Sequence, residues 1–150
     1  MSQMEAKEVK EKVENHGEII ELSIPNKGEF VSVVRLTLVA IANRVGFNIE
    51  EIEDMKVAIA EACTNAITHG KNKPSESIDI RFTLQEQGLE IQVKDRGEGC
   101  EVEKIKEPQI EELNENGLGI FIIRSLMDDV VIHSEPDQGM TIIMTKMIGR

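Results

Sequence analysis

A carboxylate and an amide stand four positions apart in an otherwise apolar stretch of the chain. The stretch runs from Val57 to Gly70 (VAIAEACTNAITHG), and the two polar residues are Glu61 and Asn65. On an α-helix this spacing leaves their side chains only about 40° apart, one turn from each other on one face. Burying polar groups without partners costs on the order of a few kcal/mol. The pair therefore predicts the lining of a pocket, although taken alone it also fits the solvent-facing stripe of an amphipathic helix.

Two glycine-rich segments further along the chain could complete such a pocket. Asp95–Gly99 (DRGEG) ends a predicted strand, and Gly117–Gly119 (GLG) leads into a predicted helix. Glycine lets a backbone approach a ligand closely, and a helix N-terminus binds anions such as phosphates. A carboxylate at a strand end can accept a hydrogen bond from an exocyclic amine such as that of adenine. Each segment alone fits a tight turn, and neither matches the common nucleotide-binding fingerprints; together with the Glu61/Asn65 helix they predict a nucleotide site.

The hydrophobic pattern predicts the elements that would position these residues. Alternating apolar residues predict strands, and apolar residues at helical spacing predict helices. The predicted strands are Glu18–Ile24, Ser77–Leu84, Leu89–Val93, Val130–Ser134 and Met140–Met147, and the predicted helices are Phe30–Asn43, Asn48–Gly70 and Ile120–Met127. This order predicts an α+β fold in which helices pack on one face of a mixed, mostly antiparallel sheet.

Local signals mark the ends of the first two helices. Asn26 with Glu29, and Asn48 with Glu51, both match the capping-box spacing at a helix start. Gly46 follows the first helix, where a residue in the left-handed conformation is favoured.

The chain divides into a short leader and one domain. Residues 1–17 are highly charged and predict a flexible leader, and residues 18–150 are long enough for a single domain with its own core. Within that domain Cys100–Asn116 shows no period and predicts a loop. A loop of this length inside a compact domain is usually functional or disordered.

Composition restricts the class of function. The net charge of −11 argues against direct binding of nucleic acid, which needs a basic patch. No signal peptide and no apolar run long enough to span a membrane is present. Cys63 and Cys100, the two cysteines, form no disulfide framework. These features favour a cytoplasmic protein.

The Glu61/Asn65 helix and the two glycine-rich segments have sequences and an order that resemble those of a known superfamily. The segments 61–70 (EACTNAITHG), 95–99 (DRGEG) and 116–119 (NGLG) are similar to the N, G1 and G2 boxes of the GHKL ATP-binding superfamily, which includes histidine kinases, type II topoisomerases, Hsp90 and MutL. The phrases EIEDMKVAIAEACTNAITHG, NGLGIFIIRSLMDDV and GMTIIMTK resemble the bacterial anti-sigma-factor serine kinases of the sporulation and general stress pathways. The resemblance extends from about Glu18 to Lys146.

The resemblance implies a two-layer α/β sandwich of the Bergerat type with three helices on one face, forming a homodimer that binds ATP or ADP with Mg²⁺. It implies that Asn65 ligates Mg²⁺, that Glu61 is the general base, and that Asp95 reads the adenine amino group. The implied nucleotide-binding residues are Thr64, Asn65, His69, Asp95, Gly97, Gly99, Gly117, Leu118, Gly119, Thr141 and Thr145. Two of these residues also fit roles other than nucleotide binding: His69 fits a packing or capping role, and Thr64 could form a hydrogen bond to its own helix.

The partners implied by the resemblance are a sigma factor, which the chain would sequester, and an anti-anti-sigma protein of the STAS type. A serine of the anti-anti-sigma protein would accept the phosphate. Arg35 matches the position at which this family contacts its sigma factor, although a free surface arginine is the simpler reading of that residue alone.

One departure from the family pattern keeps other functions open. The segment Cys100–Asn116 is shorter than the lid of the sporulation member and lacks its polar content. Because lids gate chemistry, a changed lid could leave a non-catalytic, nucleotide-sensing anti-sigma module. A detached ATP-binding half of a histidine kinase is a further alternative.

Overall fold

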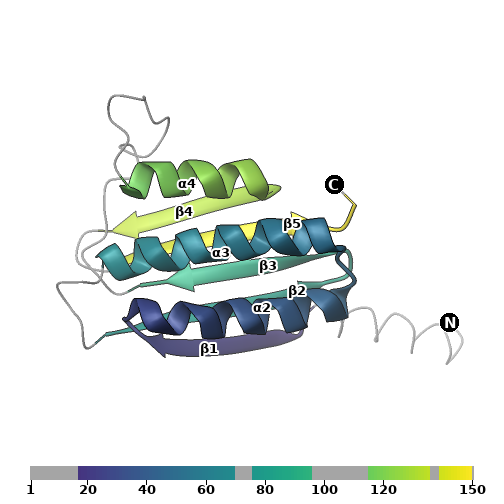
Figure 1. Cartoon of the computed structure of the whole chain (residues 1–150), viewed down its shortest axis with the longest axis horizontal. Helices are drawn as coiled ribbons and strands as arrows, with labels where there is room; N and C mark the ends of the chain where they lie inside the picture. The colour runs from purple at the N-terminus through teal and green to yellow at the C-terminus, as the bar shows by residue number, and fades with distance from the viewer. Residues whose placement is uncertain (1–16, 70–75, 96–114, 136–138, 150) are drawn as a thin grey trace, which may run out of the picture.

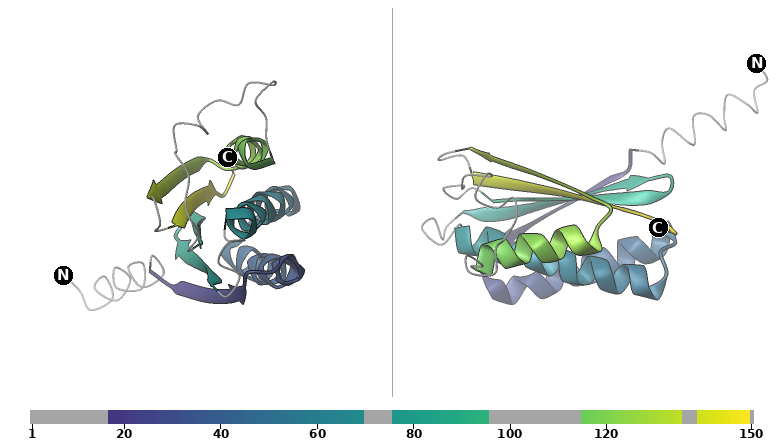
Figure 2. Two further views of the ribbon diagram at one scale, coloured as in Figure 1. Left: turned by 90° about the vertical axis from the view of Figure 1, so that its left-hand side faces the viewer. Right: turned by 90° about the horizontal axis from the view of Figure 1, so that it is seen from above.

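In the part of the chain that the structure describes, five antiparallel strands form one sheet, and three α-helices lie on one of its faces (Figures 1 and 2). The computed structural model describes residues 17–69, 76–95, 115–135 and 139–149. The elements are β1 (Ile19–Pro25), the 3₁₀ turn η1 (Gly28–Phe30), α2 (Val31–Val45), α3 (Ile49–His69), β2 (Ser77–Gln85), β3 (Gly88–Lys94), α4 (Glu115–Leu126), β4 (Asp129–Glu135) and β5 (Gly139–Met147). The order of strands across the sheet is β1-β2-β3-β5-β4.

The predicted two-layer α+β fold is confirmed, with one refinement. Every pairing among the described strands is antiparallel, so the sheet is not mixed. The second view of Figure 2 shows the sheet as one layer and the helices as the other.

Strand alternation places the core between the two layers. In β2, Ile78, Ile80, Phe82 and Leu84 are buried, while the residues between them are exposed or half-buried. Side chains that alternate along a strand point to opposite faces, so this apolar set faces the helices. α3 is the central helix and packs against both α2 and α4 as well as the sheet (Figure 1). Its small buried residues, among them Ala58 and Ala62, let it lie close to the strands.

Of the two capping boxes expected from the sequence, one is confirmed. The Asn48 side chain accepts a hydrogen bond from the Glu51 backbone N–H at 2.8 Å, and the Glu51 carboxylate accepts one from the Asn48 N–H at 2.9 Å. These reciprocal bonds satisfy two backbone donors that the first turn of α3 would otherwise leave open. Gly46 ends α2 in the left-handed conformation, with φ of 108°, as predicted.

The capping box expected at Asn26 and Glu29 is wrong. A 3₁₀ turn comes first, with Lys27 as its N-cap and no side-chain cap bond, and α2 begins only at Val31. The tighter turn displaces the start of the α-helix beyond the reach of a cap at residue 26.

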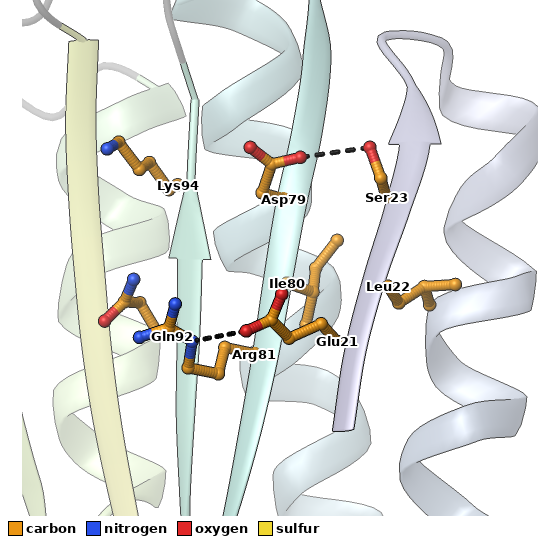
Figure 3. A pocket seen from close by; sticks show the side chains of 8 residues that line it. All are labelled: Glu21, Leu22, Ser23, Asp79, Ile80, Arg81, Gln92 and Lys94. Atoms are coloured by element: carbon orange, nitrogen blue, oxygen red, sulfur yellow. Dashed lines mark hydrogen bonds and ion pairs between the residues drawn. The ribbon is translucent and has the colours of Figure 1, made fainter. Parts of the chain in front are cut away.

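The sheet face away from the helices is polar over β1, β2 and β3. A hollow of about 330 Å³ lies on this side of the sheet, and Figure 3 shows the side chains that line it. Arg81 Nε lies 3.3 Å from Glu21 Oε1, and Ser23 donates a hydrogen bond of 3.0 Å to Asp79. This open face is separated by the sheet from the helix layer.

Several predicted features lie outside the described residues: the charged leader over residues 1–16, Gly97, Gly99 and the loop segment 100–114. Among the described helices, none is both long and apolar enough to cross a membrane.

Candidate nucleotide-binding site

Elements that carry predicted nucleotide-binding residues meet at one edge of the molecule, on the left in Figure 1. The C-terminal ends of α3 and β3 and the N-terminal ends of α4 and β5 meet there. β3 and β5 are paired through this edge, where the Asp95 backbone N–H bonds to the Met140 carbonyl at 3.0 Å.

Asn65 is a buried amide with an unsatisfied acceptor. Its side chain is on α3 and the residue is only 4% exposed. Its Nδ2 lies 3.6 Å from Met140 Sδ, whereas its Oδ1 has no hydrogen-bond partner among the described residues. Since buried polar atoms are nearly always paired, an orphaned amide oxygen at this edge indicates a ligand position. An amide oxygen is also a hard ligand suited to Mg²⁺, so Asn65 fits the ion that the resemblance implies.

Glu61 lies one turn before Asn65 and faces the start of α4. It is half-buried. A Cβ placed on Gly119 would lie 3.0 Å from Glu61 Oε2, tighter than almost all real contacts. The absent side chain at Gly119 therefore lets the α4 backbone approach the carboxylate. The structure thus places Gly119 of the second glycine segment beside Glu61 of α3.

The third helix begins earlier than predicted. α4 starts at Glu115 rather than at Ile120, so Gly117, Leu118 and Gly119 lie within its first turns instead of leading into them. Glycine weakens a helix by about 1 kcal/mol relative to alanine, which is why the sequence pattern placed the start after both glycines. Packing of α4 against α3 overrides that preference. The first turn of α4 still contributes backbone N–H groups of the kind that bind phosphate.

Asp95 follows β3 on the helix side of the sheet and is 3% exposed. Its Oδ1 accepts a hydrogen bond of 3.3 Å from the Met140 backbone N–H. A carboxylate has two oxygens with several acceptor positions, and an adenine amine is a donor of the kind that such a group accepts.

Thr141 and Thr145 are not brought to this site. In β5, Met140, Ile142 and Met144 are buried against the helices, while the two threonines are half-buried on the alternate positions. The two-residue period of a strand therefore turns Thr141 and Thr145 toward the open face, opposite Asn65. Their assignment to the adenine end is not supported by this geometry.

For the remaining predicted residues, the structure gives the place in the fold and, for some of them, the exposure of the side chain. Thr64 is exposed beside Asn65, and Leu118 is 44% exposed on α4. His69 is the last residue of α3, and its side chain is outside the described part, as are Gly97 and Gly99. Arg35 is exposed on α2, as expected. Burial raises the pKa of the Cys63 thiol to about 12, so this cysteine stays protonated and packs as a small core residue.

Met140 is the residue that the sequence pattern missed. It is 2% exposed, and it contacts Asn65 through its sulfur and Asp95 through its backbone N–H. A methionine at the start of an apolar strand indicates only a residue of the hydrophobic core. The single available signal was its place directly before Thr141, in the segment that resembles the family.

The match to known proteins defines the class. A family model described as a histidine kinase-like ATPase domain matches residues 24–146, most of the chain, so the ligand class is ATP or ADP. Serine-protein kinase RsbW of Bacillus cereus is 45% identical over 141 residues, which cover 89% of this chain and 87% of the relative. Serine-protein kinase RsbW of Oceanobacillus iheyensis is 46% identical over 139 residues, with 87% of each chain covered. The chain belongs to the RsbW family of serine-protein kinases, which confirms the resemblance noted in the sequence.

Solved structures agree on the fold. The RsbU and RsbW domains of Rv1364c from Mycobacterium tuberculosis match with a TM-score of 0.65 at 20% identity, over 87% of this chain and 32% of that longer chain. A chain of the SiaB–SiaC complex from Pseudomonas aeruginosa matches with a TM-score of 0.61 at 12% identity, over 99% of both chains. At these identities the likeness concerns the fold alone.

Proposed function

We propose that the chain is an anti-sigma factor that uses Mg²⁺-ATP to phosphorylate a serine of an anti-anti-sigma protein. The observation that carries the nucleotide part of the proposal is the buried Asn65 amide, whose Oδ1 has no partner in the described residues. The RsbW relatives, which carry the name serine-protein kinase, support the reaction class.

In this proposal Asn65 Oδ1 would hold Mg²⁺, a hard cation that takes oxygen ligands. When bound, the ion neutralises charge on the phosphates. The start of α4, where Gly117 and Gly119 lie, would hold the phosphates in this proposal, because a helix N-terminus favours anions. Asp95 accepts a hydrogen bond from the adenine amine.

Glu61 acts on the acceptor serine. Its carboxylate takes the hydroxyl proton as the serine oxygen bonds to the γ-phosphorus, and the bond between that phosphorus and ADP breaks. Phosphoryl transfer depends mainly on positioning and electrostatics, so few side chains are needed. The close contact between Gly119 and Glu61 supports this role, because it sets the carboxylate directly beside the helix start that would hold the phosphates.

The proposed partners are the sigma factor, bound through a surface that includes Arg35, and the anti-anti-sigma protein as the phosphate acceptor. The proposal also includes the homodimer implied by the sequence. Light scattering of the purified chain at several concentrations would report the oligomeric state directly.

Transfer of labelled γ-phosphate to the anti-anti-sigma protein tests the proposal. Glu61→Gln keeps the shape of the side chain but removes the base. General-base catalysis contributes roughly 10²–10⁴-fold, so we expect transfer to fall at least about 100-fold while ATP affinity stays within about twofold. Equal transfer rates in the variant and the wild type would remove the assignment of Glu61. Label on a histidine instead of a serine would contradict the reaction class.

A further inference from the structure

Met140 makes a hydrogen bond with each of two buried polar side chains of the candidate site, those of Asn65 and Asp95. It is the second residue of β5, and its side chain faces the helices. Its Sδ lies 3.6 Å from Asn65 Nδ2, and its backbone N–H donates to Asp95 Oδ1 at 3.3 Å.

The sulfur distinguishes the two ends of the Asn65 amide. A thioether can only accept a hydrogen bond, whereas an amide offers a donor end, Nδ2, and an acceptor end, Oδ1. With Nδ2 toward the sulfur, the pair makes a weak N–H···S hydrogen bond. With the amide reversed, Oδ1 would face sulfur lone pairs and the two acceptors would repel. The Met140 sulfur therefore favours the orientation that leaves Oδ1 free.

We propose that Met140 is a positioning residue for magnesium binding: it fixes the Asn65 amide so that Oδ1, and not Nδ2, faces the position of the metal ion. The inference rests on the proposed nucleotide site. An amide reversed toward the ion would present N–H groups, which cannot ligate a cation.

The backbone around Met140 allows the side chain to be tested separately. The Asp95 N–H bonds to the Met140 carbonyl at 3.0 Å, and the Met140 N–H bonds to Asp95 Oδ1. A substitution of the side chain leaves both of these bonds available. The adenine end of the site should therefore be retained when the sulfur is removed.

The matched pair of variants is Met140→Leu and Met144→Leu. Both methionines are buried on the helix-facing side of β5, and replacing methionine by leucine nearly conserves volume. Among the described residues only Met140 has its sulfur within hydrogen-bonding distance of a polar side chain. Met144→Leu therefore controls for the general effect of the substitution on the core.

Calorimetric titration with ATP, with Mg²⁺ and with a chelator, measures the effect. We expect Met140→Leu to weaken the affinity in Mg²⁺ by about two- to fivefold, to leave the affinity in chelator unchanged, and Met144→Leu to change neither. An unchanged affinity in Mg²⁺ would overturn the inference, and so would an equal loss in both conditions, which would indicate a role in pocket shape. If the wild type binds no ATP, the proposed function itself fails; normal wild-type binding with an unaffected Met140→Leu refutes the inference alone.

A second measurement needs no nucleotide. In the NMR spectrum of the free protein, the Asn65 Nδ2 protons should show a nuclear Overhauser effect to the Met140 methyl group. Absence of that contact, with the Asn65 amide protons assigned, would show that the sulfur does not hold the amide and would also overturn the inference.

Discussion

At the scale of single residues, Gly119 lets the backbone of α4 lie close to the Glu61 carboxylate on α3. A Cβ on Gly119 would lie 3.0 Å from Glu61 Oε2. The atom it meets is the far end of a flexible side chain, so the carboxylate can move away and the fold can survive.

Gly119→Ala should therefore displace the base without unfolding the protein. Alanine is also the better helix former, so we expect stability to change by less than about 1 kcal/mol. Transfer to the anti-anti-sigma protein should fall about tenfold or more, because reacting groups tolerate little misplacement. Thermal unfolding and the transfer rate, measured together, check both parts.

Gly28→Ala is the control, since nothing lies within 4 Å of a Cβ at that glycine. It should leave the transfer rate unchanged. If Gly119→Ala transferred phosphate as fast as Gly28→Ala, the close contact would have no role in holding Glu61.

Residue types predicted part of this site. The four-residue spacing of Glu61 and Asn65 was sufficient to place both on one face, because helical geometry is fixed. The side of the sheet that Thr141 faces could not be predicted in this way, since it depends on the register that buries Met140 and Met144 on the helix side. The contact between Met140 and Asn65 joins residues far apart in the chain, and no local pattern could indicate it.

At the scale of elements, the positions of α3 and α4 determine where the site residues lie. At the C-terminal end of α4, Lys146 Nζ donates to the Leu126 carbonyl at 2.7 Å, and it lies 3.8 Å from Asp54 Oδ2 on α3. At the start of α3, Glu51 completes the capping box and its other oxygen accepts the Gly149 N–H at 2.8 Å. These contacts tie both helices to the C-terminal part of the chain.

Asn48→Ala removes the cap of α3 and should destabilise the protein. Loss of an N-cap side chain typically costs about 1 kcal/mol, within a range of about 0.5–2. Urea unfolding should therefore give a lower midpoint with an unchanged slope. Asn43→Ala, an exposed position near the end of α2, is the control and should stay within about 0.5 kcal/mol of the wild type. Equal stabilities of the two variants would mean that the cap contributes little.

Prediction from sequence succeeded for elements with a long apolar pattern and failed at ends set by packing. The alternation in β2 and the capping box at Asn48 are local, so the sequence contains them in full. The starts of α2 and α4 are not set by a local pattern. A 3₁₀ turn precedes α2, and two glycines lie inside α4.

At the scale of the whole molecule, the outer side of the helix layer offers a surface for a protein partner. A hollow of about 410 Å³ is lined by Ser32, Arg35, Leu36, Val39 and Lys56 on α2 and α3. Leu36 is 72% exposed and Arg35 is exposed beside it, while Lys56 Nζ lies 3.0 Å from Glu53 Oε1. Arginine is enriched in protein interfaces, and the exposed leucine adds apolar surface that a partner could bury.

Arg35→Ala should weaken the complex with the sigma factor by about tenfold or more, as expected for an interface arginine. Its affinity for ATP should match that of the wild type, because the residue is exposed on α2 and not among the site residues at the ends of α3 and β3. Arg44→Ala, a second exposed arginine on the same helix, is the matched control. Equal loss of the complex in both variants would indicate a general charge effect instead of a contact at Arg35.

The central claim is that the Asn65 face of α3 binds ATP through magnesium. Calorimetric titration of the wild type and Asn65→Ala with ATP, each with Mg²⁺ and with a chelator, tests it most directly. We predict that Mg²⁺ strengthens binding to the wild type and that Asn65→Ala loses this gain, while Asn43→Ala keeps it. Wild-type protein that binds no ATP, or an Asn65→Ala variant with the full effect of Mg²⁺, would contradict the account.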